Sequence, residues 1–259
     1  MEINQISSNR LNDYEKLLKI CFPGKNFTEE YLDWLYFKNP LGQVVGFDAL
    51  YNGDVIAHYA CIPTKIDNFV GLLSLNTATH PSFRSQGLHV KLAKMTYEYA
   101  QNEFDFVIGV ANNNSAKNFI NKLDFVSLGK LNLRWGLLAR NPTGVRKWTS
   151  EEIEWRLNSP KTKFEAFKNS KGTIYLYCYL NKLPIKLKAQ VILECEKFPI
   201  APKRFIPPVG FTIDYNLNSR IMLQLPDLLK PSPLILIFKQ LNSKKIIVNT
   251  WSFPDFDAY

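Results

Sequence analysis

The sequence predicts an α/β (α+β) fold, in which a mixed, mostly antiparallel sheet is flanked by helices and a second, degenerate half repeats part of the same unit. Three observations point to this fold. Strand and helix periodicities follow the order β, α, α, β, β, β, α, β, α, β over residues 1–136. The dipeptide Asn52-Gly53 marks a hairpin within that series. A helix followed by a hairpin recurs after residue 150.

The early elements follow from periodicity and turn residues. We expect a strand over residues 1–6, helices over 12–22 and 28–38, two strands within 44–62, and a strand over 72–80. Thr28 is the predicted N-cap of the second helix, which should end before Pro40.

The next helix is predicted over residues 88–99, with Leu88, Leu92, Met95 and Tyr99 on one face. After it we expect a buried strand over 104–111, a short helix over 114–123 and a strand over 125–135. A late pair of strands is predicted over residues 233–240 and 245–253.

Composition sets the class of protein. With 259 residues, 46% of them hydrophobic, the chain is long enough for one large core or two modest ones. It has no run of about eighteen apolar residues and no leader pattern at its start, so we expect no membrane span, no signal peptide and a cytoplasmic location. The four cysteines form no C-x-x-C pair and have no histidine at ligand spacing, so we expect buried thiols and no metal site.

The formal net charge of +9 favours an anionic ligand. A nucleic-acid partner is not expected, because the basic residues are scattered from Lys16 to Lys245 without a dense run. A small ligand that carries phosphate fits the same charge. The sequence does not indicate whether the protein is a monomer or an oligomer.

A phosphate site is predicted where the strand over 72–80 meets the helix that begins at Leu88. The first turn of a helix presents unpaired backbone N–H groups and the positive end of the helix dipole. Gly87 permits close approach of a ligand to the backbone, and Arg84 adds a charged donor. The residues alone therefore predict a bound phosphate or pyrophosphate.

The run Arg84-Ser85-Gln86-Gly87-Leu88-His89 resembles the R/Q-x-x-G-x-G/A acyl-CoA signature of the GNAT acetyltransferase superfamily. Residues 112–129 resemble the second motif of that family, with Asn113, Ala116 and Phe125 at matching offsets. The resemblance covers about residues 1–136 and implies acetyl-CoA as cofactor. The residues that it implies at the cofactor are Ala78, Thr79, Arg84, Ser85, Gln86, Gly87, Leu88, His89, Asn113, Asn114 and Phe119.

Three positions depart from the family pattern. His89 replaces a small residue beside the pyrophosphate, and Asp124 stands where a glycine is common. Ile120 occupies the position at which many members keep a tyrosine that protonates the departing thiolate. The source of a general acid is therefore open.

The resemblance implies direct attack of an amine on the thioester, which needs a donor to the carbonyl oxygen and a base. Asn76 lies on the strand expected to supply the donor. His80, at the end of that strand, is the first candidate for the base, although it could instead cap the turn beside Pro81. His58 is the second candidate, although a histidine in an apolar strand is more often a hydrogen-bonded core residue.

The second half is predicted to be a degenerate GNAT-like domain over residues 140–259, after a catalytic domain over residues 1–139. Trp34, Pro40, Gly53 and Pro63 recur in order as Trp155, Pro160, Gly172 and Pro184, although two ordinary helix-hairpin units could match by chance. Residues 201–210 contain prolines, which lack the N–H groups that a phosphate site requires. Only the first half is expected to bind CoA.

The last residues offer further carboxylates. Asp255, Asp257 or the terminus at Tyr259 could serve as the base if the tail returns to the thioester. A solvated tail is the alternative that we favour at this point.

The function expected from the resemblance is N-acetyltransfer to a primary amine, with a nucleotide-linked amino sugar of surface-polysaccharide synthesis as first choice of acceptor. A peptide, a polyamine or an aminoglycoside remains open as acceptor. Two rival functions are a Fem-like aminoacyl transferase, which pairs two such halves, and a non-catalytic CoA-binding module.

Overall fold

The computed structural model describes residues 1–137, 146–168, 172–179, 186–194, 198, 209–216, 222–226 and 234–256. The chain divides into two compact units, each of which is discontinuous in sequence. Unit 1 contains residues 1–109, 114–127 and 237–246, and unit 2 contains residues 110–113, 128–236 and 247–259. The predicted domain boundary between residues 139 and 140 stays a prediction, and the contacts place residues 237–246 in unit 1.

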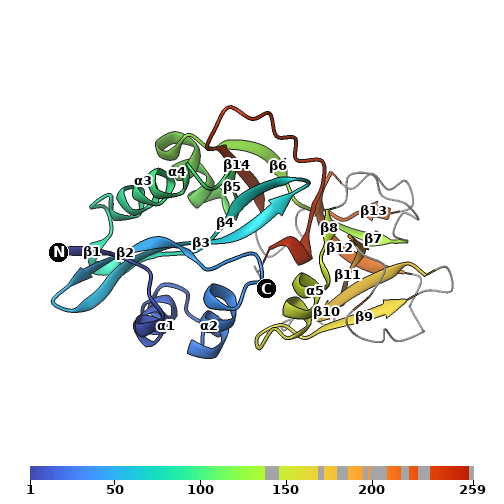
Figure 1. Ribbon diagram of the computed structural model, residues 1–259, viewed down its shortest axis with the longest axis horizontal. Coiled ribbons are helices and arrows are strands. Elements are labelled where there is room, and N and C mark those ends of the chain that lie inside the picture. Colours follow the sequence, from blue (N-terminus) through green and yellow to red (C-terminus); the bar gives the residue numbers. More distant parts are fainter. Residues whose placement is uncertain are drawn as a thin grey trace. The chain divides into compact units, whose positions relative to one another are not determined.

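The first sheet confirms the predicted α/β class, and Figure 1 shows its helices on both faces. Its elements are β1 (Glu2–Gln5), α1 (Leu11–Cys21), α2 (Glu29–Phe37), β2 (Val45–Tyr51), β3 (Asp54–Ile66), β4 (Phe69–Thr79), α3 (Leu88–Ala100), β5 (Phe106–Ala111), α4 (Asn113–Leu123), β6 (Val126–Lys130) and β14 (Ile235–Gln240).

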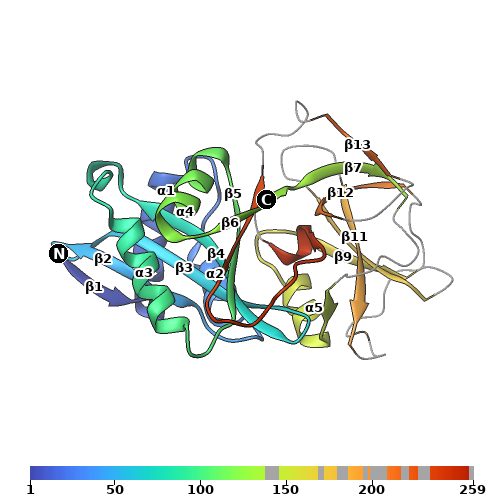
Figure 2. The same ribbon diagram turned by 90° about the horizontal axis from the view of Figure 1, so that it is seen from above.

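Among the described residues the strand order of this sheet is β1-β2-β3-β4-β5-β14-β6. Neighbouring strands from β1 to β4 are antiparallel, and β4 pairs parallel with β5. Helices α1 and α2 pack on one face, and α3 crosses β2 and β3 on the other (Figure 2). The sheet is mixed, as predicted.

Two local predictions are confirmed. Asn52 and Gly53 have φ of 51° and 88°, the left-handed geometry of a hairpin turn between β2 and β3. The side chain of Thr28 accepts a hydrogen bond from the backbone N–H of Tyr31 and so caps α2.

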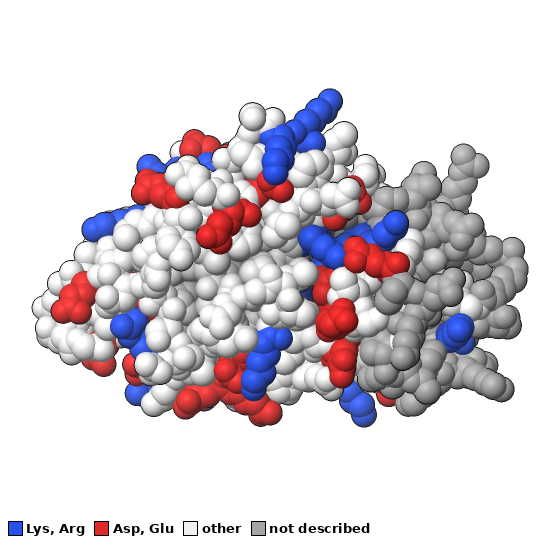
Figure 3. All heavy atoms as spheres, in the orientation of Figure 1, with Lys and Arg blue, Asp and Glu red and all other residues white. Residues whose placement is uncertain are grey.

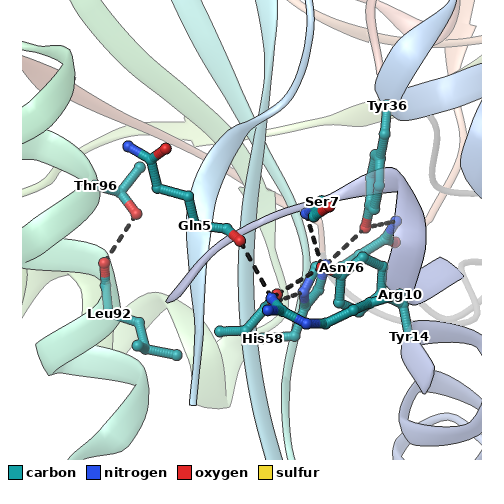
Figure 4. Close-up of polar contacts among 10 residues, drawn as sticks. Gln5, Ser7, Arg10, Tyr14, Tyr36, His58, Asn76, Leu92 and Thr96 are labelled. Carbon is teal, nitrogen blue, oxygen red and sulfur yellow. Dashed lines mark hydrogen bonds and ion pairs between the residues drawn. The ribbon is translucent and has the colours of Figure 1, made fainter. Parts of the chain in front are cut away.

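Helix α3 differs from its prediction in the face that it buries. Leu88 and Leu92 are buried as expected, but Tyr99 is 54% exposed. The buried stripe continues through Thr96, Tyr97 and Ala100, because packing against β2 and β3 selects this side of the helix. The Thr96 hydroxyl donates to the Leu92 carbonyl at 2.8 Å, so this buried hydroxyl has a hydrogen-bond partner within the helix (Figure 4).

The single strand predicted over residues 125–135 is two strands in two sheets. β6 ends at Lys130 and belongs to the first sheet, whereas β7 (Asn132–Gly136) belongs to the second. Leu131 lies between them, 1% exposed, and its N–H donates to the Leu234 carbonyl at 2.8 Å. Periodicity could not find this break, because each part keeps the pattern of a strand.

The second sheet has the described order β13-β7-β12-β11-β10-β9, with β15 beside β12 and β8 beside β11. Its buried core contains Trp148, Ile153, Leu176 and Val191. The further elements of this unit are β8 (Lys147–Trp148), α5 (Ser150–Leu157), β9 (Phe164–Lys168), β10 (Ile174–Tyr179), β11 (Lys186–Leu193), β12 (Gly210–Tyr215), β13 (Met222–Gln224) and β15 (Trp251–Ser252).

The two late strands are not a pair. β14 lies in the first sheet between β5 and β6, where Phe238 stacks on Phe106 of β5 with ring centroids 5.5 Å apart. Residues 245–253 contribute only β15, which pairs with β12. Sequence patterns identified the strand over 235–240, but they carried no information about its sheet.

No helix among the described residues is long and apolar enough to span a membrane. Cys61 and Cys178 are buried thiols, as predicted, but Cys21 is only half-buried, and Cys195 lies outside the described residues.

Candidate functional site

The parallel pairing of β4 with β5 ends before either strand does. Its register runs from Gly71 opposite Phe106 to Ser74 opposite Gly109. β4 nevertheless continues to Thr79 and β5 to Ala111. Backbone groups of the last part of β4 on the side of β5 are therefore available to a ligand that lies along the strand.

A β-bulge distorts β4 in the same segment. His58 pairs with Ala78 and Ala60 pairs with Leu75, so that Tyr59 lies opposite two residues, Asn76 and Thr77. Asn76 has φ of 51°, a conformation that few residues other than glycine adopt. A bulge leaves one residue outside the ladder and redirects its backbone and side chain.

The loop after β4 leads directly to the start of α3. A 3-10 turn over Pro81–Phe83 is followed by Ser85 with φ of 64° and Gly87 with φ of 73°. Gly87 is the N-cap of α3 and makes no side-chain cap, and a Cβ there would meet no heavy atom within 4 Å. The corner is thus open, and the amides of the first helical turn can bind an anion.

Arg84 is exposed on the loop, but its side chain is anchored to the end of the strand. Its Nε donates to the Thr79 carbonyl at 3.3 Å, which holds the guanidinium at the end of β4, in the loop that leads to α3. The half-buried Cys21 thiol donates to the same carbonyl at 3.3 Å. Burial raises the pKa of Cys21 against the opposing effect of Arg84, so we expect this group to be a thiol at neutral pH.

His80 caps the turn that follows it. Its Nδ1 accepts a hydrogen bond from the Ser82 N–H at 3.3 Å, and its ring makes an edge contact with Phe83. The neutral ring then carries its proton on Nε2. To act as the predicted base, His80 would have to release Ser82.

The predicted cofactor residues fall into two groups. Arg84, Ser85, Gln86 and Gly87 are exposed on the loop, and Thr79 and His89 are partly exposed. Ala78, Leu88 and Phe119 are buried, at 4%, 4% and 6% exposure. Phe119 packs against Tyr59 and Phe125, so its described contacts are those of a core residue.

His89 lies on the first turn of α3. Burial, with a smaller effect of Lys122, lowers its pKa, so the ring is neutral at physiological pH. Any contact of His89 with a phosphate is therefore a neutral hydrogen bond rather than an ion pair.

The second motif lies where the resemblance places it. Asn113 and Asn114 are exposed at the start of α4, directly after β5. Asp124 follows the end of α4 with φ of 58°, which explains why a glycine suits that position. Ile120, 36% exposed on α4, supplies no proton.

His58 belongs to a buried polar chain that sequence reasoning did not find (Figure 4). Its Nδ1 lies 2.6 Å from Asp48 Oδ1 and its Nε2 lies 3.0 Å from the Tyr36 hydroxyl. Tyr36 in turn accepts a hydrogen bond from Asn76 Nδ2 at 3.0 Å. The Asn52-Gly53 turn identified the hairpin, but a register shift between Ala49 and Leu50 brings Asp48 opposite His58, so the turn by itself did not predict this pair.

The carboxylates of the tail belong to the second unit. Asp255 is 4% exposed, caps Ser252 and lies 3.4 Å from Arg146. The expectation of a solvated acid is therefore wrong for Asp255, whose burial raises its pKa although Arg146 offsets part of the effect. Asp257 and Tyr259 lie outside the described residues.

Charges of both signs alternate over the face that Figure 3 shows. Its described part has no large field of one sign, in keeping with the scattered basic residues of the sequence. Among the described residues, no cluster of three or more His, Cys, Asp or Glu side chains could hold a metal ion.

Comparisons with known proteins show the fold. No family model matches the chain, and no curated protein sequence matches it. A putative acetyltransferase from Pyrococcus horikoshii aligns over 96% of this chain and 92% of its own, with a TM-score of 0.52 and 9% identity. A GCN5-related N-acetyltransferase from Anabaena variabilis ATCC 29413 aligns over 93% of this chain and 73% of its own, with a TM-score of 0.55 and 10% identity. The chain therefore has the GNAT fold that residues 84–89 and 112–129 predicted.

Proposed function

We propose that the protein is an N-acetyltransferase that moves an acetyl group from acetyl-CoA to a primary amine. One observation carries this proposal: β4 leaves its parallel partner at Ser74 and leads within a short loop to the open, uncapped start of α3 at Gly87. An extended ligand with an anionic group at one end matches a free strand edge followed by a helix N-terminus. CoA has that form.

The chain's own residues suit the two parts of CoA. The first amides of α3 and the guanidinium of Arg84 would hold the pyrophosphate, since both are donors and the space around Gly87 is open. Backbone groups of β4 beyond Ser74 would bind the amides of the pantetheine arm as a neighbouring strand does. Asn113 and Asn114, exposed after β5, could contact the arm from the other strand.

The chemistry is acyl transfer, for which acetyl-CoA supplies the activated thioester. The amine nitrogen forms a C–N bond at the acetyl carbonyl, the C–S bond breaks, and the thiolate takes up a proton. A backbone N–H at the bulge of Asn76 and Thr77 would stabilise charge on the carbonyl oxygen. His80 remains the proposed proton acceptor, provided that Ser82 is released.

The acceptor that we propose is a nucleotide-linked amino sugar of surface-polysaccharide synthesis, used in the cytoplasm. It rests on the family resemblance of the sequence and on the net charge of +9, which suits an acceptor that itself carries a diphosphate. Acetylation of peptides alone in an amine panel would overturn this choice.

Calorimetric titration with CoA tests the cofactor. Gly87→Glu places a carboxylate at the helix start and a side chain at φ of 73°, and Arg84→Ala removes the charged donor. We expect Gly87→Glu to raise the Kd at least about tenfold, and Arg84→Ala about threefold to tenfold. Gly172→Glu is the matched control, since Gly172 has φ of 86° in a turn of the second unit. Equal affinity of wild type and Gly87→Glu would contradict the proposal.

A non-catalytic CoA-binding module is the second candidate, and Ile120 favours it because this side chain cannot protonate the thiolate. Mass spectrometry of acetyl-CoA incubated with a panel of amines separates the two. Acetylated product supports the transferase, and CoA binding without any product supports the module.

A further inference from the structure

A chain of hydrogen bonds connects a buried carboxylate on β2 to the bulge of β4. Asp48 is fully buried and accepts from the Tyr14 hydroxyl and from His58, each at 2.6 Å. Arg10 lies 3.8 Å from the same carboxylate and offsets part of its charge. From His58 the chain passes to Tyr36 of α2 and then to Asn76 of β4, at 3.0 Å for each step (Figure 4).

The carboxylate sets the direction of every bond in this chain. A carboxylate only accepts, so His58 carries a proton on Nδ1, and in the neutral ring Nε2 is then an acceptor. Tyr36 must therefore donate its hydroxyl proton to Nε2. The phenol oxygen is then an acceptor toward Asn76, which must present Nδ2 to it.

The same logic fixes the other end of the Asn76 amide. Because Nδ2 is held by Tyr36, the carbonyl oxygen Oδ1 points away from the buried chain. Within the described part of the protein Oδ1 has no hydrogen-bond partner, and Asn76 is partly exposed. Oδ1 is thus an oriented acceptor at the segment of β4 that lies beyond the last pair with β5.

Burial keeps the chain in this state. It raises the pKa of Tyr36 well above its usual range, so the phenol stays protonated and remains a donor to His58. Aligned hydrogen bonds polarise one another, and the negative charge of Asp48 is the origin of this alignment. The terminal Oδ1 therefore favours a donor N–H, and most of all a positively charged one.

We propose that Oδ1 of Asn76 binds the N–H of the acceptor amine, and that Asp48, His58 and Tyr36 are positioning residues that hold the Asn76 amide in this orientation. This inference rests on the proposed transferase function, which places the thioester beside the same segment of β4. A carbonyl oxygen that accepts one N–H leaves the nitrogen lone pair free to attack once the ammonium has lost a proton.

Tyr36→Phe and Tyr14→Phe form a matched pair of variants. Both remove a buried hydroxyl from the same network, but only Tyr36 lies between Asp48 and Asn76. We expect Tyr36→Phe to raise the acceptor KM about 10-fold to 100-fold, the effect of losing an oriented hydrogen bond to a charged group, while the Kd for CoA changes less than about twofold. Tyr14→Phe should leave both constants within about twofold.

Asn76→Gly tests the other end of the chain of hydrogen bonds. It keeps the inference testable if the Tyr36→Phe variant does not fold. Glycine tolerates φ of 51°, so the bulge should persist while the amide is lost. Its acceptor KM should rise as much as that of Tyr36→Phe, and the double variant should show no further rise, because both act through the same oxygen.

The assay uses three amine probes: a UDP-linked amino sugar, a short peptide with a free N-terminus, and spermidine. The probe that wild type acetylates fastest is used for all variants. An unchanged acceptor KM in Tyr36→Phe and Asn76→Gly would overturn this inference and leave the transferase function standing. CoA binding by wild type without acetylation of any probe would overturn the transferase function, and the inference with it.

Discussion

In the first sheet β2, β3 and β4 run antiparallel and β4 then pairs parallel with β5, and in the second sheet β9, β10, β11 and β12 repeat that succession. The strand beyond the parallel pair comes in each case from a distant part of the chain. β14 fills this place beside β5, and β7 fills it beside β12. The two sheets thus share a strand order and a manner of completion.

Local features agree with that order. Thr28 caps the helix before β2, and Thr149 caps the helix before β9. Gly53 and Gly172 have φ of 88° and 86° in the turns that follow the first strand of each series. These similarities favour the predicted duplication, which remains a prediction; its last matched residue, Pro184, lies outside the described residues.

The sheets differ at the strand that would border a ligand. The β3–β4 register shifts at a bulge, whereas the β10–β11 register is unbroken from Ile174 to Tyr179. The connection after β4 leads into α3, whereas residues 199–208 after β11 include four prolines, which have no N–H to offer an anion. The comparison teaches that the two sheets share a strand order, and that the bulge and the connection after β4 distinguish the sheet that holds the candidate site.

Phe106→Ala should have the largest effect on stability. Phe106 is fully buried, and its ring covers Gly71 of β4, where a Cβ would lie 2.4 Å away, and stacks on Phe238 of β14. We expect a loss of about 3–5 kcal/mol in the free energy of unfolding, from the cavity that remains. Urea denaturation measures it, with the exposed Tyr99→Ala as the control.

If Phe106→Ala lowered the free energy of unfolding by less than about 1 kcal/mol, the comparison between the two sheets would be contradicted. It would mean that β14 does not complete the first sheet as β7 completes the second. Hydrogen exchange of the β14 amides provides an independent check, since these amides should lose protection in Phe106→Ala.

We expect Lys188 to make the free energy of unfolding of the second unit depend on pH. It is buried on β11, with its ammonium 4.7 Å from the centroid of the Tyr175 ring, and burial lowers its pKa from 10.5 to about 8. Between pH 8 and 10.5 the unfolded chain keeps a proton that the folded chain has released, so the free energy of unfolding rises with pH across this window. The total rise expected from the shift is about 3 kcal/mol.

Lys188→Met should abolish that rise and stabilise the protein at pH 7, as followed by denaturation at a series of pH values. Lys186→Met, on the same strand but exposed, should retain the rise. Identical pH profiles for wild type and Lys188→Met would show that this lysine is solvated in the folded state.

The smallest effect is expected for the N-caps of α2 and α5, which allow the two units to be compared directly. Thr28→Ala and Thr149→Ala should each lower the free energy of unfolding by about 1 kcal/mol, because each removes one acceptor from a helix N-terminus. Faster amide exchange should be confined to α2 in the first variant and to α5 in the second. Serine at either position should restore the protection, and a shared response of both helices would argue against separate units.

Much of the first sheet could be predicted because its determinants are local. The Asn52-Gly53 turn, the Thr28 cap and the apolar run of β5 each depend on a few neighbouring residues. The motif at residues 84–89 placed the candidate site for the same reason, since a strand end, a positive φ at Gly87 and a helix start occupy one short stretch.

The sequence-based predictions failed where residues far apart in the sequence determine the structure. Tyr99 is exposed because packing of α3 against β2 and β3 selects its buried face. Asp255 is buried beside Arg146, which lies more than a hundred residues earlier in the sequence and offsets part of its charge. The chain from Asp48 to Asn76 joins four separate elements, and only the Asp48–His58 step lies within one hairpin.

The amino-acid sequence by itself determined most of the elements, the main hairpin and the open start of α3 at which a phosphate site is predicted, because periodicity, turn geometry and helix capping act over a few residues. Only the tertiary structure decided which sheet receives β7 and β14, where β4 leaves β5, and which way the amide of Asn76 points. Strand pairing and hydrogen-bond direction depend on partners that are far apart in the chain and are fixed when the core packs.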